Sequence, residues 1–223
     1  MFSAVANGLA SLSLALKQPL PSFCDLETSH GDALVTKGGD YLTWVQVGGM
    51  QRMAERQDYN GMTEAMRLDL SGALEDRGHA IVGWYISDPD AAQVEIERVN
   101  LTSCRNIASA LGLDLRGILG ERAALWPKVM RWEAAHFILW TRTSALTKEE
   151  RRQLKLEYAE NARQTGALGN TQRLYLRSEV MSARHAAFVS RVVSALRAHD
   201  VSASVLDPHE ALRMSRQAMY REM

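Results

Sequence analysis

Residues 33–47 read ALVTKGGDYLTWVQV, and this stretch decides the fold class. Two apolar, β-branched runs, residues 33–37 and 41–47, flank Gly38-Gly39-Asp40, which is typical of a hairpin turn. Gly48-Gly49 then ends the second predicted strand. A hairpin here makes a sheet the framework on which the other elements pack.

Further elements follow the hairpin along the chain. Apolar runs predict strands at residues 80–86, 134–141 and 201–206, the second of them buried in the centre of the sheet. Apolar residues at three- and four-residue spacing predict the helices, which cover residues 63–76, 89–111, 147–165, 179–198 and 208–223. The predicted fold is α+β, a mixed sheet of about five strands with packed helices.

Several helix ends carry explicit signals. Asp88-Pro89 and Asp207-Pro208 each combine an N-cap aspartate with a proline at the first helical position. Residues 147–150, TKEE, form a capping box. Gly78 is expected as a left-handed cap after the first helix. The glycines of residues 112–120, together with Pro127, are expected to break up the middle of the chain.

An amphipathic arm is predicted at the N-terminus. Its apolar residues recur at steps of three and four, which places one stripe on a helix face: Phe2, Val5, Leu9, Leu12 and Leu16. Pro19 and Pro21 end this helix. We therefore expect an arm over residues 1–18 and an α+β domain over residues 19–223. The stripe can pack on its own core, on a neighbouring subunit or on a membrane surface, and we hypothesise the neighbour.

Composition indicates one globular domain. The 223 residues are 46% hydrophobic and 23% charged, with a formal net charge of zero. Residues 1–100 carry a net charge of −7, residues 101–197 carry +8, and residues 198–223 carry −1. This asymmetry can steer a partner, or the halves can pair within the fold. No basic block is interleaved with aromatic residues, so direct nucleic-acid binding is not expected.

The two cysteines, Cys24 and Cys104, form neither a disulfide framework nor a zinc-binding spacing, which favours a reduced cytosol. No run of 18 apolar residues predicts a membrane span. Phosphate-binding loops, nucleophile elbows and zinc-protease motifs are also missing from the sequence. We therefore assign no catalytic, cofactor-binding or metal-binding residue, and we expect His136 to be a hydrogen-bonded core histidine.

Two groups of residues leave alternatives open. The carboxylates Asp25, Glu27, Asp32 and Asp40 crowd the first hairpin. They form either a solvated edge or a divalent-metal site of the nuclease kind. Trp44, Trp84 and Trp140 lie on predicted strands and are expected in the core, with a partner-facing aromatic patch as the alternative. Trp126 and Trp132 flank Pro127 in a basic region expected to be a loop, and they are candidate interface residues.

One family resemblance adds to these patterns. Residues 22–28, SFCDLET, precede a Leu-Val strand, a Gly-Asp turn and a strand that ends in Gly-Gly. This order resembles the N-terminal region of type IV secretion and conjugation ATPases of the IcmB/DotO/TraU kind. Residues 78–81, followed by Tyr85 and Asp88-Pro89, match the position of a later strand in that region. The resemblance covers residues 20–95 by motif and the rest by element order.

The resemblance implies a non-catalytic module of a bacterial P-loop ATPase. In that family the module precedes the ATPase domain, docks at inner-membrane components of the secretion channel and contributes to self-association. It implies a cytoplasmic protein peripheral to the inner membrane, with ATP and Mg²⁺ bound only by a downstream domain. The alternatives are a stand-alone metal-dependent nuclease-like enzyme and an adaptor or chaperone that binds a partner helix.

Overall fold

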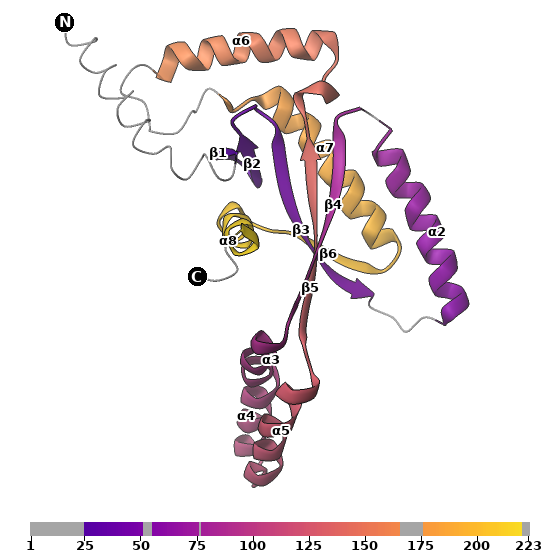
Figure 1. Cartoon of the computed structure of the whole chain (residues 1–223), viewed down its shortest axis with the longest axis vertical. Helices are drawn as coiled ribbons and strands as arrows, with labels where there is room; N and C mark the ends of the chain where they lie inside the picture. Colours follow the sequence, from indigo (N-terminus) through magenta and orange to yellow (C-terminus); the bar gives the residue numbers. More distant parts are fainter. Residues whose placement is uncertain (1–24, 51–54, 76, 166–175, 220–223) are drawn as a thin grey trace, which may run out of the picture. The chain divides into compact units, whose positions relative to one another are not determined.

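The computed structural model of the chain describes residues 25–50, 55–75, 77–165 and 176–219 (Figure 1). The chain divides into two compact units. The sheet unit comprises Met1–Gly83 and His136–Met223, and the helical unit comprises Trp84–Ala135. The sequence did not predict a separate helical body inside the α+β domain. The predicted N-terminal arm lies outside the described residues.

Six strands form one sheet within the described part of the chain. Five follow the order β1-β2-β3-β5-β4, and β6 also pairs with β3. Their bounds are Leu26–His30 for β1, Ala33–Thr36 for β2, Tyr41–Met50 for β3, His79–Asp88 for β4, Trp132–Thr141 for β5 and Val201–Val205 for β6. The α+β class is confirmed. The sheet has one strand more than expected, and its strands pair antiparallel, whereas a mixed sheet was expected.

The predicted hairpin is confirmed as β2 and β3. The Thr36 amide donates to the Asp40 carbonyl at 2.9 Å, and Gly39 takes a positive φ of 81° in the turn. The prediction that Gly48-Gly49 ends the second strand is wrong, because β3 continues to Met50. A side chain at Gly48 would come within 3.2 Å of Ser202, so the glycine permits close pairing with β6. Strand β1, which precedes the hairpin, was not predicted.

Both faces of β3 are covered. Tyr41 and Val45 contribute to the buried clusters shared with α7, Glu179–Ala198. Leu42 points to the other face because side chains alternate along a strand, and it pairs with Leu34 of β2. Helix α8, Pro208–Met219, contacts β2. The hairpin is therefore an interior element of the sheet unit.

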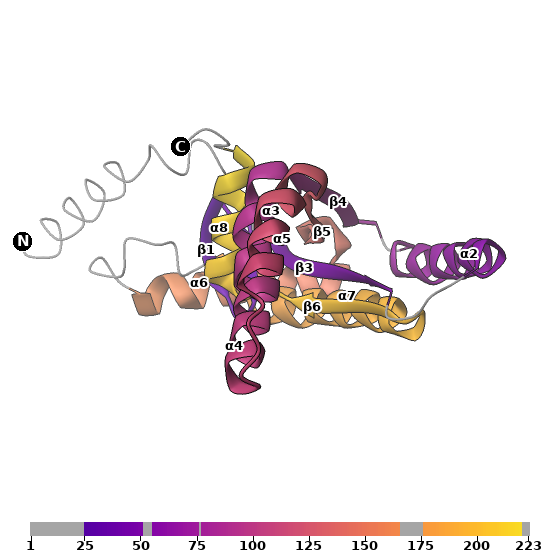
Figure 2. The same cartoon turned by 90° about the horizontal axis from the view of Figure 1, so that it is seen from below.

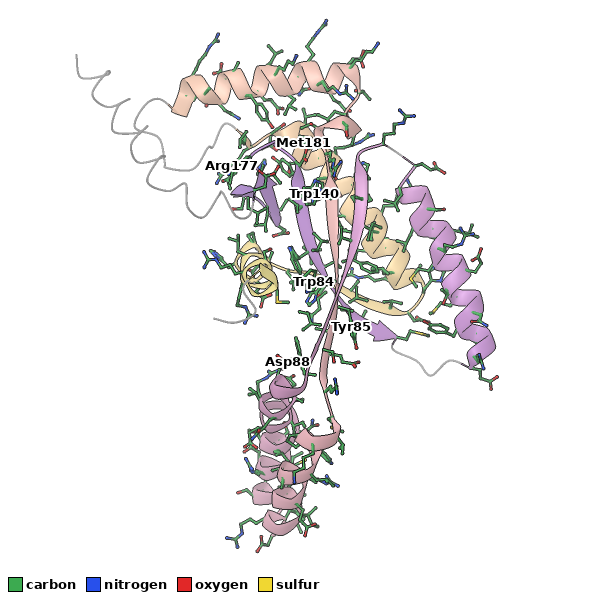
Figure 3. The ribbon with its side chains drawn as sticks, in the orientation of Figure 1. Trp84, Tyr85, Asp88, Trp140, Arg177 and Met181 are labelled. Atoms are coloured by element: carbon green, nitrogen blue, oxygen red, sulfur yellow. The ribbon has the colours of Figure 1, made fainter. Side chains whose placement is uncertain are left out.

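Helix α7 matches its prediction in both ends and in its buried face. Met181, Phe188, Val192 and Leu196 are buried as expected. Figure 3 shows Met181 at the start of α7 and Trp140 near the end of β5. Helix α7 packs on β3, on β6 and on α2, Arg56–Ala73 (Figure 2). Helix α2 begins seven residues before its predicted start.

The capping predictions for two other helices of the sheet unit hold. In α6, Lys148–Thr165, the Thr147 amide donates to Glu150 Oε2 at 2.7 Å, and the Glu150 amide donates to Thr147 Oγ1 at 3.2 Å. In α8, the Asp207 carboxylate accepts the amide of His209 at 2.8 Å. A short 3-10 helix, Thr143–Ala145, precedes α6.

Gly78 has the predicted positive φ, at 101°, but for another reason. Helix α2 has its C-cap at Leu74, so Gly78 is not the cap. A Cβ at Gly78 would lie 2.6 Å from the backbone nitrogen of Ala145. Close approach of two backbone segments therefore requires glycine here.

The helical unit contains α3, Pro89–Glu95, a π-helix η1, Ile96–Leu101, α4, Thr102–Ala110, and α5, Arg116–Val129. The Asp88 carboxylate accepts the Ala91 amide at 3.1 Å, which confirms the predicted Asp-Pro start (Figure 3). Within η1 the bonding pattern brings residues five apart to the same side, and both Ile96 and Leu101 are buried.

Gly112 ends α4 in a left-handed conformation with φ 65°. The Leu113 amide donates to the Ala108 carbonyl at 2.9 Å, which completes a Schellman cap. The prediction that Gly117, Gly120 and Pro127 break up the next stretch is wrong, because all three lie within α5. Pro127 lies in the last turn of α5, so it removes its own bond to the Ala123 carbonyl while only two helical residues follow it.

Candidate interaction surface on the helical unit

The helical unit exposes most of its large apolar side chains. Among the described residues, 16 large hydrophobic side chains are exposed, and ten of them belong to this unit. The ten are Tyr85, Val94, Val99, Ile107, Leu111, Leu113, Ile118, Leu125, Val129 and Met130. Single exposed aliphatic residues are ordinary, but such a concentration on one small body makes it a candidate interaction surface.

The core of the helical unit is small by comparison. Three fully buried residues, Ile96, Leu101 and Leu119, form its centre, and partly buried side chains pack around them. Helix α5 contacts both η1 and α3. The unit therefore folds around few residues and exposes more large apolar side chains than its core buries.

Helix α5 shows how the exposed residues are arranged. At 100° per residue, Leu115, Leu119 and Trp126 fall on the side that packs on the core. Ile118, Leu125 and Val129 fall within about 40° of one another on a different side of the helix. Their exposed fractions are 54%, 57% and 71%. We call these three residues the α5 stripe.

Small residues occupy the side of α5 opposite the core. Gly117, Gly120 and Ala124 are exposed there. A Cβ at either glycine would meet no atom within 4 Å, so packing inside this chain does not require glycine at these positions. A glycine inside a helix costs about 0.5–1 kcal/mol relative to alanine. The described contacts offer no compensation for that cost.

Six charged side chains of the helical unit form ion pairs with near neighbours. Arg98 binds Glu95 at 2.8 Å, Arg105 binds Glu97, and Arg116 binds Asp114 at 2.9 Å. The guanidinium carbon of Arg122 lies 5.2 Å from the centre of the Trp126 ring. Glu121 and Lys128, both on α5, have no ion pair within the part of the chain that the structure describes.

The two tryptophans proposed as interface residues do not lie on a loop. Trp126 is in α5, half-buried against the core of the helical unit. Trp132 is the first residue of β5 and is also half-buried. Sequence reasoning missed the α5 stripe because the glycines and the proline predicted an irregular segment. The other predicted interface residues, Phe2, Val5, Leu9, Leu12 and Leu16, lie outside the described residues.

The acidic side chains near the first hairpin of the sheet unit differ in their surroundings, and one of them has a structural role. Asp25 and Asp32 are exposed, whereas the Asp40 carboxylate accepts two hydrogen bonds. One comes from the Thr143 amide at 3.0 Å and the other from Trp140 Nε1 at 3.3 Å. Asp40 thus ties the hairpin turn to the segment after β5. Among the described residues, no group of three or more His, Cys, Asp or Glu side chains is placed to hold a metal ion.

A buried histidine that the sequence did not single out joins three elements of the sheet unit. His185 of α7 contacts Thr43 Oγ1 of β3 through Nε2 and Thr141 Oγ1 of β5 through Nδ1, each at 2.8 Å. Burial lowers the pKa of His185 to about 4, and the nearby His79 adds to this effect. A neutral imidazole at this site holds α7 on the sheet.

His136 and Tyr41 are also buried in the sheet unit. His136 stacks edge-on against Trp44 with ring centres 5.8 Å apart, but its Nδ1 has no hydrogen-bond partner, so the expectation of a fully hydrogen-bonded histidine is wrong. The Tyr41 hydroxyl donates to the Ser178 carbonyl at 3.1 Å and accepts from the Ser178 amide at 2.9 Å. Burial raises the pKa of Tyr41, so its hydroxyl stays protonated and cannot act as a base.

No protein-family model matches the chain, and no curated protein matches it. None of the helices described by the structure has both the length and the apolar character needed to cross a bilayer.

Proposed function

We propose that this chain is a non-catalytic docking and assembly domain of a bacterial type IV secretion or conjugative-transfer ATPase. The observation that carries the docking role is the exposed aliphatic surface of the helical unit, centred on the α5 stripe. The sequence resemblance over residues 20–95 supports the choice of family.

The physical argument for docking rests on the unfavourable exposure of aliphatic groups to water. Burying one leucine, isoleucine or valine side chain fully stabilises a protein by about 1.5–3 kcal/mol. The α5 stripe gains little of this free energy within the chain, because its side chains are more than half exposed. Association with a partner recovers it. Three ion pairs of the unit are already formed within it, so their charges need no new partner on docking, whereas Glu121 and Lys128 would need one from the partner.

The proposed setting is cytoplasmic and peripheral to the bacterial inner membrane. The expected partners are inner-membrane components of the secretion channel and further copies of the same chain. ATP and Mg²⁺ would be bound by a downstream domain. In this proposal the described fold has a structural role, because its buried polar groups take part in packing.

The test is the coding sequence that follows the codon for Met223. We expect a phosphate-binding loop, G-x-x-x-x-G-K-[ST], within the same polypeptide. A natural stop codon at that point, with no ATPase gene beside it, would contradict the assignment to this family.

A calorimetric titration of the isolated chain with ATP tests the non-catalytic part of the proposal. We expect no saturable heat signal, because the sequence contains no phosphate-binding loop. Saturable binding with micromolar affinity would overturn this part.

A further inference from the structure

We infer that α5 of the helical unit pairs antiparallel with α5 of a second copy of this chain. The inference names one partner for the docking surface, so its biological meaning rests on the proposed function. Its physical basis is independent of that function, because the α5 stripe and the pair Glu121 and Lys128 are each spaced to match themselves across one two-fold axis.

The small residues indicate that the partner is a helix. Gly117, Gly120 and Ala124 let another backbone approach α5 closely, and the open space around both glycines leaves room for it. Close helix–helix packing is the usual reason for small residues on a helix face. A lipid surface makes no such demand, because acyl chains adapt to any side-chain shape.

The α5 stripe is spaced for pairing with itself. Ile118 and Val129 are eleven residues apart, about 16 Å along the helix axis. A two-fold axis midway between them places Ile118 of each copy opposite Val129 of the other copy, so this contact occurs twice in the dimer. Leu125 then lies close to the axis, on one flank of a contact whose other flank carries the small residues and whose centre carries Glu121 and Lys128. An isologous contact of this kind uses the same surface on both copies.

The unpaired charges follow the same symmetry. Glu121 and Lys128 are seven residues apart, so they share one side of α5 but lie about 10 Å apart along it, too far to pair within the helix. Their midpoint lies within one residue, about 1.5 Å, of the midpoint between Ile118 and Val129. In the antiparallel pair each Glu121 therefore comes beside Lys128 of the other copy. Two intermolecular ion pairs would form beside the aliphatic contact.

The size of the contact sets its strength. One pair of 14-residue helices buries less than the roughly 800 Å² per partner of a standard stable interface. Ile107 and Leu111, exposed on the adjoining α4 segment, can enlarge it. We therefore expect a reversible dimer that forms in the micromolar concentration range.

The experiment is sedimentation equilibrium of the full chain over a range of concentrations, with a charge-swap series. Glu121→Lys and Lys128→Glu should each weaken the dimer by about tenfold or more, because each places like charges opposite each other. The double variant, E121K with K128E, should restore it. Glu149→Lys, at an exposed position of α6, is the matched control and should leave the dimer unchanged.

A second variant tests the small-residue face without changing charge. Ala124→Leu adds bulk at an exposed helix position, so the fold should persist by circular dichroism while the dimer weakens by about tenfold or more. A chain that stays monomeric, a dimer insensitive to these variants, or a charge-swap double variant without restored association would overturn the inference. Binding of a monomer to vesicles of anionic phospholipid would instead assign the surface to lipid.

These results separate the inference from the proposed function. A phosphate-binding loop after Met223 with no α5-dependent dimer would leave the proposed function standing and remove the inference. If the natural chain ends at Met223 and forms a dimer that the charge swaps weaken, the inference would stand and the proposed function would be removed.

Discussion

The sheet unit and the helical unit belong to one chain but use their aliphatic residues in opposite ways. In the sheet unit, Leu139 and Val45 are wholly buried, and so is Val192 of α7, which packs in the same cluster. In the helical unit, Leu125 and Val129 remain more than half exposed. The comparison shows that helices of similar apolar content can either bury their aliphatic residues or leave them exposed. The outcome depends on which neighbours the topology supplies.

The largest expected effect contrasts a buried with an exposed leucine. Leu139→Ala should lower the free energy of unfolding by about 2–5 kcal/mol, because it removes buried methyl groups and leaves a cavity. Leu125→Ala should cost less than about 1 kcal/mol in the monomer. Urea unfolding at protein concentrations below the dimer range measures both. Equal losses would show that the α5 stripe is part of a core.

The second prediction concerns acid stability of the sheet unit. The pKa of His185 is about 4 in the folded chain, against about 6.5 when unfolded, so the unfolded state binds the proton first as pH falls. Stability should be complete above pH ~6.5 and should decline by roughly 2–3 kcal/mol as pH falls to about 4.

The His185→Asn variant provides the control for this pH dependence. It should be less stable at neutral pH and should lose the part of the slope between these pH values that His185 causes. Urea midpoints measured from pH 7 to pH 4 check both points. An unchanged slope in the variant would assign the pH dependence to other groups.

The third prediction compares helix caps in the two units. Thr147→Ala in the capping box of α6 and Asp88→Ala at the start of α3 should each cost about 1 kcal/mol. Because the helical unit has the smaller core, the same loss of stability should make its local unfolding more frequent. Amide hydrogen exchange should therefore quicken more in η1 and α5 after Asp88→Ala than in α6 after Thr147→Ala. The opposite order would mean that the helical unit is the more stable body.

The smallest expected effect comes from glycines with open surroundings. Gly61 lies in α2, is exposed, and a Cβ there would meet no atom within 4 Å. Gly61→Ala should therefore stabilise the chain by about 0.5–1 kcal/mol. Gly120→Ala should stabilise the monomer by a similar amount but weaken the dimer, since it fills the small-residue face. Thermal melts measure the stability of both variants, and sedimentation measures their dimerisation. If Gly120→Ala leaves the dimer as unchanged as Gly61→Ala does, the small-residue face of α5 takes no part in the contact.

The sequence by itself determined the features that arise from interactions a few residues apart. Thr147 and Glu150 cap each other, Asp207 caps α8, and the glycines of the hairpin turn allow the conformation that joins β2 to β3. The periodic apolar residues of α7 likewise fixed its ends and its buried face. Each of these signals depends on residues within about one turn of the backbone and not on contacts between residues far apart in sequence.

Only the tertiary structure decided the features that depend on residues far apart in sequence. The Asp40 carboxylate bonds to the Thr143 amide, and His185 joins Thr43 to Thr141, across separations that no local pattern encodes. Gly117, Gly120 and Pro127 weaken a helix locally, yet packing of Leu119 on Ile96 and Leu101 outweighs them and forms α5. The exposure of the α5 stripe has the same origin. Residues of one helix are buried or left open according to which elements the chain folds against them.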